Sequence, residues 1–335
     1  MSDQADQLRK LVRDTVQQHP SLQPGVPLVV LSGGKGGVGV STVATELAHE
    51  LASLGKRSVL VDANPLQPDI ATQLGLEVRG CLADVLDGNR TAVEVLQPLG
   101  ESMQLLPGRW APERPPELGH EAVRRLLTEL RALHAQADVV ILDAGSGMSP
   151  WVSQLWKSAQ QILLVSTHES VAVMDSYAAV KLSPWGDVDG KVRLVINQCD
   201  EPQAAKSIGR RFEATCRRFL GIHIAPPIAL PSHPDIVATV TQRNEEQAER
   251  DFRQSIRLLA AEVMSTSLAF AGTTSLGSAM RGAASLEYTN STSAQRNATA
   301  DTPSGGLLPP QPEMAHRAPP KENHYLPEKS LQNEK

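Results

Sequence analysis

Aromatic residues and cysteines are scarce in this sequence. Phe, Trp and Tyr make up 3% of the 335 residues, so Val, Leu, Ile and Ala must build the core. The three cysteines, Cys81, Cys199 and Cys216, stand far apart, and their spacing matches neither a CxxC pair nor a Cys/His ligand set. This spacing argues against a disulfide framework and a zinc site, so we expect a reduced, cytoplasmic protein.

Long apolar runs and long basic runs are also lacking. No apolar stretch reaches the length of a transmembrane helix, and the polar first residues do not resemble a signal peptide. The formal net charge is -5, so the overall charge does not indicate a nucleic acid or an anionic membrane as a partner, although local patches stay open. With 41% hydrophobic residues, the chain can bury one large core or two small ones.

What the sequence does contain is a glycine-rich loop between an apolar run and an amphipathic helix. The run Leu28–Leu31 predicts a buried strand, and the helix is expected to continue to about Leu54. Glycines in such a loop let successive amide N–H groups converge on phosphate oxygens at the helix N-terminus. A glycine-rich turn without a ligand is the alternative. The residues predicted to contact a nucleotide here are Gly34, Gly36, Gly37, Val38, Gly39, Val40, Ser41 and Thr42.

The loop departs from the common phosphate-binding pattern at one position. The pattern G-x-x-x-x-G-K-[ST] fits from Gly34 to Ser41, but Val40 stands where lysine is expected. Valine offers neither charge nor donor to the β- and γ-phosphates. A lysine does occur early in the loop, at Lys35, and in this respect the loop resembles the deviant Walker A loop of the MinD/ParA ATPases. The resemblance implies that Lys35 is catalytic and crosses a dimer interface to the nucleotide of the partner.

Two further apolar runs end in an aspartate. Asp62 ends the run from Ser58, and Asp143 ends the run from Ala137. Strand ends of this kind place carboxylates at the sheet edge where ligands bind, and Asp143 is typical of a Walker B aspartate that holds magnesium. Both carboxylates could instead cap a following helix. The resemblance implies a magnesium site of Ser41, Asp62 and Asp143, with both aspartates catalytic.

The segment after Asp62 carries a second departure from the family. Asp62-Ala63-Asn64-Pro65 resembles the family's D-A-D-P, in which the second aspartate is tied to hydrolysis or activation. Here Asn64 replaces that aspartate. Farther along, the resemblance implies that Asn197 and Pro231 contact the adenine base, while the alternative for Asn197 is a turn residue.

Two segments resemble the flagellar branch of the family, the FlhG/YlxH/FleN group. Residues 162–181 resemble its V-T-T-P-E-P-T-S-I-T-D-A-Y-A-L-I-K block, with His168 and Ser170 in place of prolines. The first residues resemble its D-Q-A-x-x-L-R segment, which engages the signal-recognition-type GTPase FlhF. An ordinary amphipathic surface helix is the alternative. The partner-binding residues implied are Asp3, Gln4, Ala5, Leu8 and Arg9.

The order of elements predicts an α/β three-layer sandwich with a mostly parallel sheet, a P-loop NTPase fold of the deviant Walker A type. We expect an amphipathic helix over residues 1–20, the nucleotide-binding domain over 25–270 and a disordered tail over 271–335, rich in Gly, Ser, Thr, Asn and Pro. The tail lacks a basic amphipathic helix, so attachment to the inner face of the cell membrane is left unsupported.

The functional hypothesis is an ATP- and Mg²⁺-dependent switch that controls flagellar number or placement. The resemblance implies an ATP-dependent homodimer, an FlhF-type GTPase and flagellar basal-body components as partners, and no specific nucleic acid. Hydrolysis is expected to be slow because Val40 and Asn64 replace two functional residues. Three alternatives stay open: a pseudo-ATPase scaffold, a ParA-type positioning ATPase that binds DNA, and a polar-localisation adaptor without flagellar partners.

Overall fold

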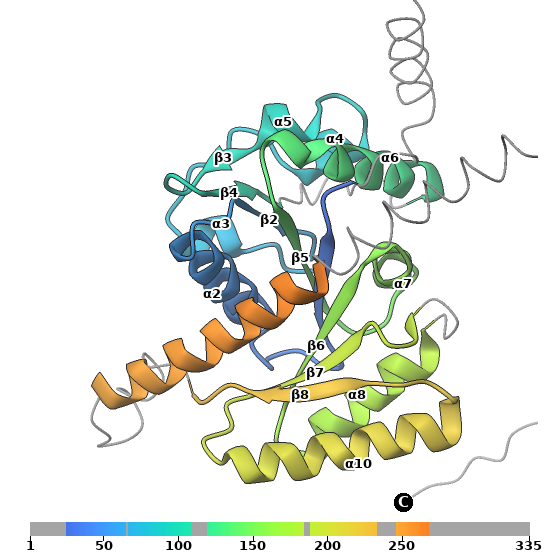
Figure 1. Cartoon of the computed structure of the whole chain (residues 1–335). Helices are drawn as coiled ribbons and strands as arrows, with labels where there is room; N and C mark the ends of the chain where they lie inside the picture. Colours follow the sequence, from blue (N-terminus) through green and yellow to red (C-terminus); the bar gives the residue numbers. More distant parts are fainter. Residues whose placement is uncertain (1–24, 65, 109–118, 184–187, 233–245, 268–335) are drawn as a thin grey trace, which may run out of the picture. The chain divides into compact units, whose positions relative to one another are not determined.

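The computed structural model describes residues 25–64, 66–108, 119–183, 188–232 and 246–267 (Figure 1). The chain separates into two compact units, residues 1–283 and 284–335, and the second lies wholly outside the described residues. The helix predicted over residues 1–20, its partner-binding residues and the predicted tail also lie outside them. None of the described helices is long and apolar enough to cross a bilayer.

Eight strands of the described residues form one sheet in the order β3-β4-β2-β5-β1-β6-β7-β8. All neighbouring strands pair in parallel except β3 and β4, which are antiparallel. The mostly parallel sheet predicted from the sequence is therefore confirmed. The strands are β1 (Leu28–Gly33), β2 (Ser58–Asp62), β3 (Gln97–Pro98), β4 (Met103–Leu106), β5 (Val139–Ser146), β6 (Gln161–Thr167), β7 (Val192–Asn197) and β8 (Ala225–Ala229).

Helices connect the strands and cover both faces of the sheet (Figure 1). They are α2 (Val40–Ser53), α3 (Ile70–Gln73), α4 (Leu82–Leu86), α5 (Ala92–Val95), α6 (His120–Arg131), the 3₁₀ turn η2 (Ala132–Ala135), α7 (Pro150–Ser158), α8 (Ser170–Leu182) and α10 (Pro202–Leu220). A last helix, coloured orange in Figure 1, covers residues 246–267.

The core has two apolar layers, one on each face of the sheet. Strand β1 contributes to both, because Leu28 and Val30 face one layer while Val29 and Leu31 face the other. Helices α4, α5, α6, α7 and α10 bury their apolar sides in the first layer, and α2, α3 and the helix of residues 246–267 do so in the second. This arrangement confirms the three-layer sandwich.

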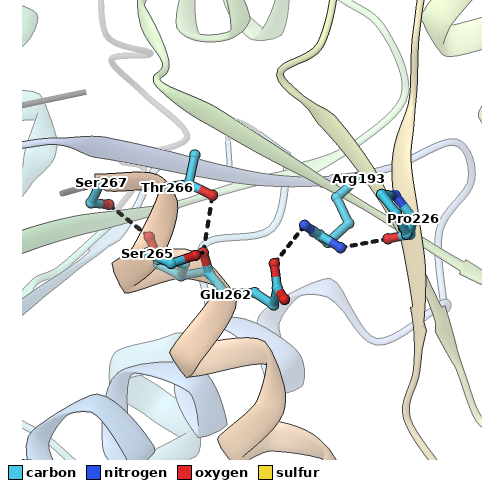
Figure 2. A network of polar contacts seen from close by, with 7 residues as sticks. Arg193, Pro226, Glu262, Ser265, Thr266 and Ser267 are labelled. Carbon is cyan, nitrogen blue, oxygen red and sulfur yellow. Dashed lines mark hydrogen bonds and ion pairs between the residues drawn. The ribbon is translucent and has the colours of Figure 1, made fainter. Parts of the chain in front are cut away.

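Ion pairs join the helix of residues 246–267 both to the sheet and to α2. Glu262 accepts a hydrogen bond from the Arg193 Nη2 atom of β7 at 2.8 Å, and Arg193 Nη1 donates to the Pro226 carbonyl of β8 (Figure 2). Arg257 pairs with the buried Glu50 of α2 at 2.8 Å. This last helix therefore joins the end of the sheet to α2, the helix that follows the glycine-rich loop.

Candidate functional site

The glycine-rich loop lies at the carboxyl end of β1, the strand that pairs with β5 on one side and with β6 on the other. Gly39 precedes α2 with a left-handed φ of 88°, and no side chain caps the N-terminus of the helix. The first turn of α2 also lacks an acidic residue. Its first backbone N–H groups therefore remain for an anion, which the helix dipole also favours.

Close packing explains why two positions of the loop are glycine. A Cβ atom on Gly34 would lie 2.3 Å from the backbone nitrogen of Ser176 in α8, and one on Gly39 would lie 2.4 Å from Asn197 Nδ2. Around Gly36, the nearest atom to such a Cβ is the Ser146 hydroxyl at 3.8 Å. The loop is thus wedged between β7 and α8, while Gly36 leaves room for a ligand.

The two valines of the loop point into the core. Val38 and Val40 are 1% and 8% exposed, and both belong to the apolar layer under α2. They can meet a nucleotide only through their backbone atoms. Ser41 is half-buried and Thr42 is exposed, so their hydroxyl groups are the polar side-chain atoms available at the start of the helix.

Asp62 and Asp143 lie side by side at the carboxyl ends of β2 and β5, where they are partners in the strand register. Both are buried, at 1% and 0% exposure. One oxygen of each accepts a backbone hydrogen bond, from Ile70 N at 3.1 Å for Asp62 and from Gly145 N at 2.9 Å for Asp143. The other oxygens, Asp62 Oδ1 and Asp143 Oδ2, have no hydrogen-bond partner among the described residues.

The pKa values of these carboxyl groups reflect their burial. Loss of solvent, together with the nearby charge of Asp143, raises the pKa of Asp62 to about 7. Burial also raises the pKa of Asp143, against the opposing effect of the Ser41 hydroxyl and the Gly145 N–H. Two buried carboxylates with free oxygens are a costly arrangement unless a cation neutralises them.

The chemistry of this pair fits magnesium. Mg²⁺ is commonly held by one or two carboxylates together with phosphate oxygens and water. The described residues contain no cluster of three or more His, Cys, Asp or Glu side chains suited to hold a metal alone. Asp62, Asp143 and the Ser41 hydroxyl would therefore hold the ion together with a phosphate bound at the loop.

Lys35 lies at the rim of the loop rather than inside it. Its Nζ atom is 3.2 Å from Glu169 Oε2 at the beginning of α8; the Lys35 side chain is partly exposed and the Glu169 side chain is exposed. Neither the sequence motif nor its spacing had pointed to this ion pair. The proposed transfer of Lys35 to a second subunit stays a prediction.

Asn197 and Pro231 come together at the carboxyl edge of the last strands. Asn197 Nδ2 donates to the Val38 carbonyl at 2.9 Å, so this buried amide braces the loop. Pro231 follows Leu230, whose backbone bonds Ile196 and Cys199 on either side of Asn197. The bracing role of Asn197 was not foreseen, and its contact with a base stays a prediction.

The replaced residue Asn64 lies against the loop that follows β5. Its Oδ1 atom accepts from Leu66 N at 3.1 Å and Gln67 N at 3.3 Å, and a Cβ on Gly145 would lie 2.5 Å from this oxygen. Asn64 therefore closes its own turn and packs against Gly145. An aspartate there would carry charge into this contact.

Two indole groups connect α7 with the site. Trp151 Nε1 donates to the Ala63 carbonyl at 2.8 Å, and Trp156 Nε1 donates to Ser32 Oγ at 3.0 Å. Both tryptophans are buried, so they pack in the core while their indole N–H groups are satisfied.

A groove of about 350 Å³ lies between α8 and α10. It is lined mainly by apolar side chains, among them Val173, Met174, Tyr177, Ile208 and Phe212. Met174 is 71% exposed, which is unusual for a side chain of this kind. Because Gly34 packs against α8 near Ser176, the groove and the glycine-rich loop share one helix.

Comparison with known proteins adds three findings. Residues 26–190 match the ParA family described as the NUBPL iron-transfer P-loop NTPase. The chain is similar to the antiactivator FleN of Pseudomonas aeruginosa, at 28% identity over 207 residues, which cover 62% of this chain and 74% of FleN. It is also similar to the flagellum site-determining protein YlxH of Helicobacter pylori, at 22% identity over 55% of this chain and 62% of YlxH.

The fold has solved counterparts. The septum site-determining protein MinD of Pyrococcus horikoshii, solved as a complex with Mg-ADP, superposes with a TM-score of 0.53 at 19% identity. The match covers 71% of this chain and 95% of that protein. At this level of identity the likeness shows the fold alone.

Proposed function

Because this chain belongs to the ParA/MinD family of P-loop NTPases, we propose that it is an ATP-binding switch that regulates flagellar number or placement. One observation carries the nucleotide part: the uncapped N-terminus of α2 lies at the same sheet edge as the free oxygens of Asp62 and Asp143. The similarity to FleN and to the flagellum site-determining protein YlxH supports the flagellar part.

One set of residues in the site binds phosphate, and another set binds the cation. The backbone N–H groups from Gly34 to Ser41 bind the β- and γ-phosphates of ATP. Asp62, Asp143 and Ser41 hold magnesium, which neutralises phosphate charge when it is bound. Asn197 keeps the loop in shape by holding the Val38 carbonyl.

Lys35 is the residue that distinguishes the two states of the switch. In the isolated chain its ammonium group pairs with Glu169. We propose that, in an ATP-bound homodimer, this lysine leaves Glu169 for the phosphates of the second subunit. Glu169 stands at the beginning of α8, and the glycine-rich loop packs against the same helix. The loss of the Lys35–Glu169 ion pair therefore alters α8, which lines the groove between α8 and α10. An FlhF-type GTPase or a basal-body component bound in this groove would sense the change.

Hydrolysis is expected to be slow. The side chain of Val40 lies in the core and supplies no hydrogen-bond donor to the γ-phosphate. The side chain of Asn64 is an amide and not a carboxylate. Loss of one preorganised donor typically slows a reaction roughly 100- to 1000-fold. A pseudo-ATPase scaffold is the second candidate that this feature favours.

Light scattering during an ATP titration tests the switch. With Mg²⁺ and millimolar ATP, the full chain should shift from monomer to dimer, and Lys35→Ala should abolish the shift while leaving nucleotide binding by calorimetry in place. Lys56→Ala, another exposed lysine, is the matched control and should dimerise normally. A wild-type chain that binds ATP and stays monomeric would favour the scaffold.

A GTPase assay tests the flagellar partnership separately. A peptide of residues 1–20 should bind an FlhF-type GTPase and raise its hydrolysis rate, and Gln4→Ala should weaken both effects. If the peptide leaves the GTPase rate unchanged, this segment does not act on an FlhF-type GTPase, despite its resemblance to the flagellar motif.

A further inference from the structure

Helix α10 carries an unusual concentration of unpaired positive charge. Its sequence holds five cationic residues and one acidic residue, although the whole chain has a net charge of -5. All five cations are exposed, and we call them the basic face: Lys206, Arg210, Arg211, Arg217 and Arg218. Within the described residues, one of the five has a carboxylate partner: Arg217 pairs with Glu213 at 3.4 Å.

The other arginines of the described residues behave differently. Each one outside α10 binds either a carboxylate or a backbone carbonyl, as in the pair Arg57–Asp138 or the bond from Arg131 to the Ser158 carbonyl. Among the described residues, the arginines that bind neither a carboxylate nor a backbone carbonyl are thus all on α10, which makes a general excess of surface charge a poor explanation.

The geometry of the helix arranges these cations in two rows. At about 100° per residue, Lys206, Arg210 and Arg217 share one line along α10, and Arg211 and Arg218 share a second about a third of a turn away. The small or neutral side chains of Gln203, Ser207 and Ala214 lie between the rows. From Lys206 to Arg218 the basic face extends about 18 Å.

Bulky apolar side chains stand out at one end of this surface. Phe219, at the end of α10, is 63% exposed, and Leu182, at the end of α8, is 69% exposed. Each follows a cation directly, Arg218 and Lys181, and the Arg218 guanidinium lies 5.2 Å from the centre of the Phe219 ring. Side chains of these two kinds, placed together, suit a boundary between anionic headgroups and an apolar layer.

The same end of the domain lies opposite the nucleotide loops. Helices α8 and α10 each connect parallel strands, so they begin at the carboxyl edge of the sheet and end at its amino edge. Figure 1 shows α8 and α10 ending on the same side, away from the beginning of α2. Asp189, an acidic residue of this edge, is bonded to His223.

We propose that the basic face, together with Phe219 and Leu182, docks the folded domain on an anionic phospholipid bilayer. A duplex nucleic acid would satisfy the cations but not the two apolar tips, whereas a bilayer surface offers both an anionic and an apolar layer. The end of α10 that carries Arg217, Arg218 and Phe219 lies at the amino edge, so docking through this end leaves the glycine-rich loop open to a second subunit. This attachment uses the folded domain itself and does not depend on the switch proposed above.

Vesicle co-sedimentation of the full chain tests the proposal. The chain should sediment with vesicles of equal parts phosphatidylglycerol and phosphatidylcholine, stay in solution with pure phosphatidylcholine, and be released at high salt. Arg217→Gln/Arg218→Gln should weaken partitioning about 25-fold, at about fivefold for each cation. Phe219→Ser should weaken it about tenfold, with less effect on the salt dependence.

The matched control is Arg250→Gln/Arg253→Gln, which removes the same charge from another exposed helix and should sediment like the wild type. Unfolding midpoints verify that every variant is folded, and ATP binding should be unchanged in all of them. Failure of the wild type to sediment, or equal losses in the α10 pair and the control, would overturn the proposal. Salt-sensitive binding to duplex DNA without vesicle binding would also overturn it in favour of a nucleic-acid surface.

Discussion

Val40 differs from the lysine expected at this position both in its chemistry and in the direction of its side chain, which points into the core. Its side chain packs beneath the loop, where a Cβ on Gly33 would lie 3.1 Å from Val40 Cγ2. A lysine at this position must carry its ammonium group out of an apolar layer to reach a phosphate. The packing around Val40 therefore suits a valine side chain, so a lysine at this position is expected to change the stability of the fold as well as the rate of hydrolysis.

We expect Val40→Lys to lower the free energy of unfolding by about 1–3 kcal/mol, since the new side chain overfills a packed site. We also expect it to raise the single-turnover rate of ATP hydrolysis, at most by the roughly 100- to 1000-fold that one donor supplies. Urea titration and a single-turnover assay measure the two effects. Val40→Met, which adds length without charge, is the control; it should destabilise the chain and leave the hydrolysis rate unchanged. A hydrolysis rate in Val40→Lys equal to that of the wild type would show that this position does not limit hydrolysis.

Asp62 gives stability an unusual dependence on pH. Its pKa is about 7 in the folded chain, against 3.8 for an unperturbed aspartate. Between these values the folded state keeps a proton that the unfolded state releases, so the stability of the magnesium-free protein falls as pH rises from about 4 to about 7. Above pH 7 the full penalty of the buried charge is present.

Asp62→Asn should remove this penalty. Without magnesium, the variant should gain up to about 4 kcal/mol over the wild type at pH 8 and little at pH 4, from urea titrations at both pH values. It should also lose stabilisation by Mg²⁺ and nucleotide. Asp87→Asn, at an exposed site, is the control. A constant difference between wild type and Asp62→Asn across this range would contradict the raised pKa.

At the scale of elements, the glycine-rich loop and α8 are held together by Gly34 and by the pair of Lys35 with Glu169. Glu169→Gln frees the lysine, so the ATP-dependent dimer should form at a lower protein concentration. Exposed ion pairs contribute about 0–1 kcal/mol, which limits the gain to about fivefold. Light scattering at fixed ATP measures it, with Glu201→Gln at the beginning of α10 as the control. Weaker dimerisation in Glu169→Gln would mean that this carboxylate acts within the dimer instead.

A second link between elements joins β7 to the helix of residues 246–267. Arg193 is 8% exposed, and its Nε atom has no partner among the described residues (Figure 2). Loss of the Glu262 carboxylate leaves this guanidinium buried beside a single carbonyl, that of Pro226. Since Glu262 itself is half-exposed, the cost is less than for a fully buried pair.

Glu262→Gln should therefore lower the free energy of unfolding by about 1–3 kcal/mol in urea titration. Glu249→Gln on the same helix removes an exposed partner of Arg253 and should cost less than about 0.5 kcal/mol. Equal effects of the two substitutions would mean that the bond to Arg193 does not hold this helix in place.

At the scale of the whole molecule, nucleotide binding should appear as stability. A ligand that binds only the folded state at 100 times its dissociation constant adds about 2.7 kcal/mol. ATP with Mg²⁺ should therefore raise the thermal midpoint of the full chain, and chelation of Mg²⁺ or Asp143→Asn should remove most of the rise. Thermal unfolding followed by tryptophan fluorescence measures it, because Trp151 is bonded to Ala63, which follows Asp62, and Trp156 to Ser32 near the end of β1. An unchanged midpoint at saturating ATP would contradict the proposed site.

The sequence by itself determined the layers and the position of the site. Apolar runs that end in aspartate, glycines before an amphipathic helix and the alternation of strands with helices are local signals, and local signals follow from torsional preference and periodicity. They predicted β1, α2, the strand ends at Asp62 and Asp143 and the mostly parallel sheet. The short pieces β3, α3, α4 and α5 were not predicted, because segments of two to five residues carry too little periodicity.

Only the tertiary structure decided which distant residues meet. Asn197 braces Val38 across 159 positions of the chain, and Lys35 pairs with Glu169 across 134. The inward direction of Val40 and the free cations of α10 likewise depend on what packs around them. Such contacts arise when whole elements pack on the sheet, so no motif or spacing within one segment can contain them.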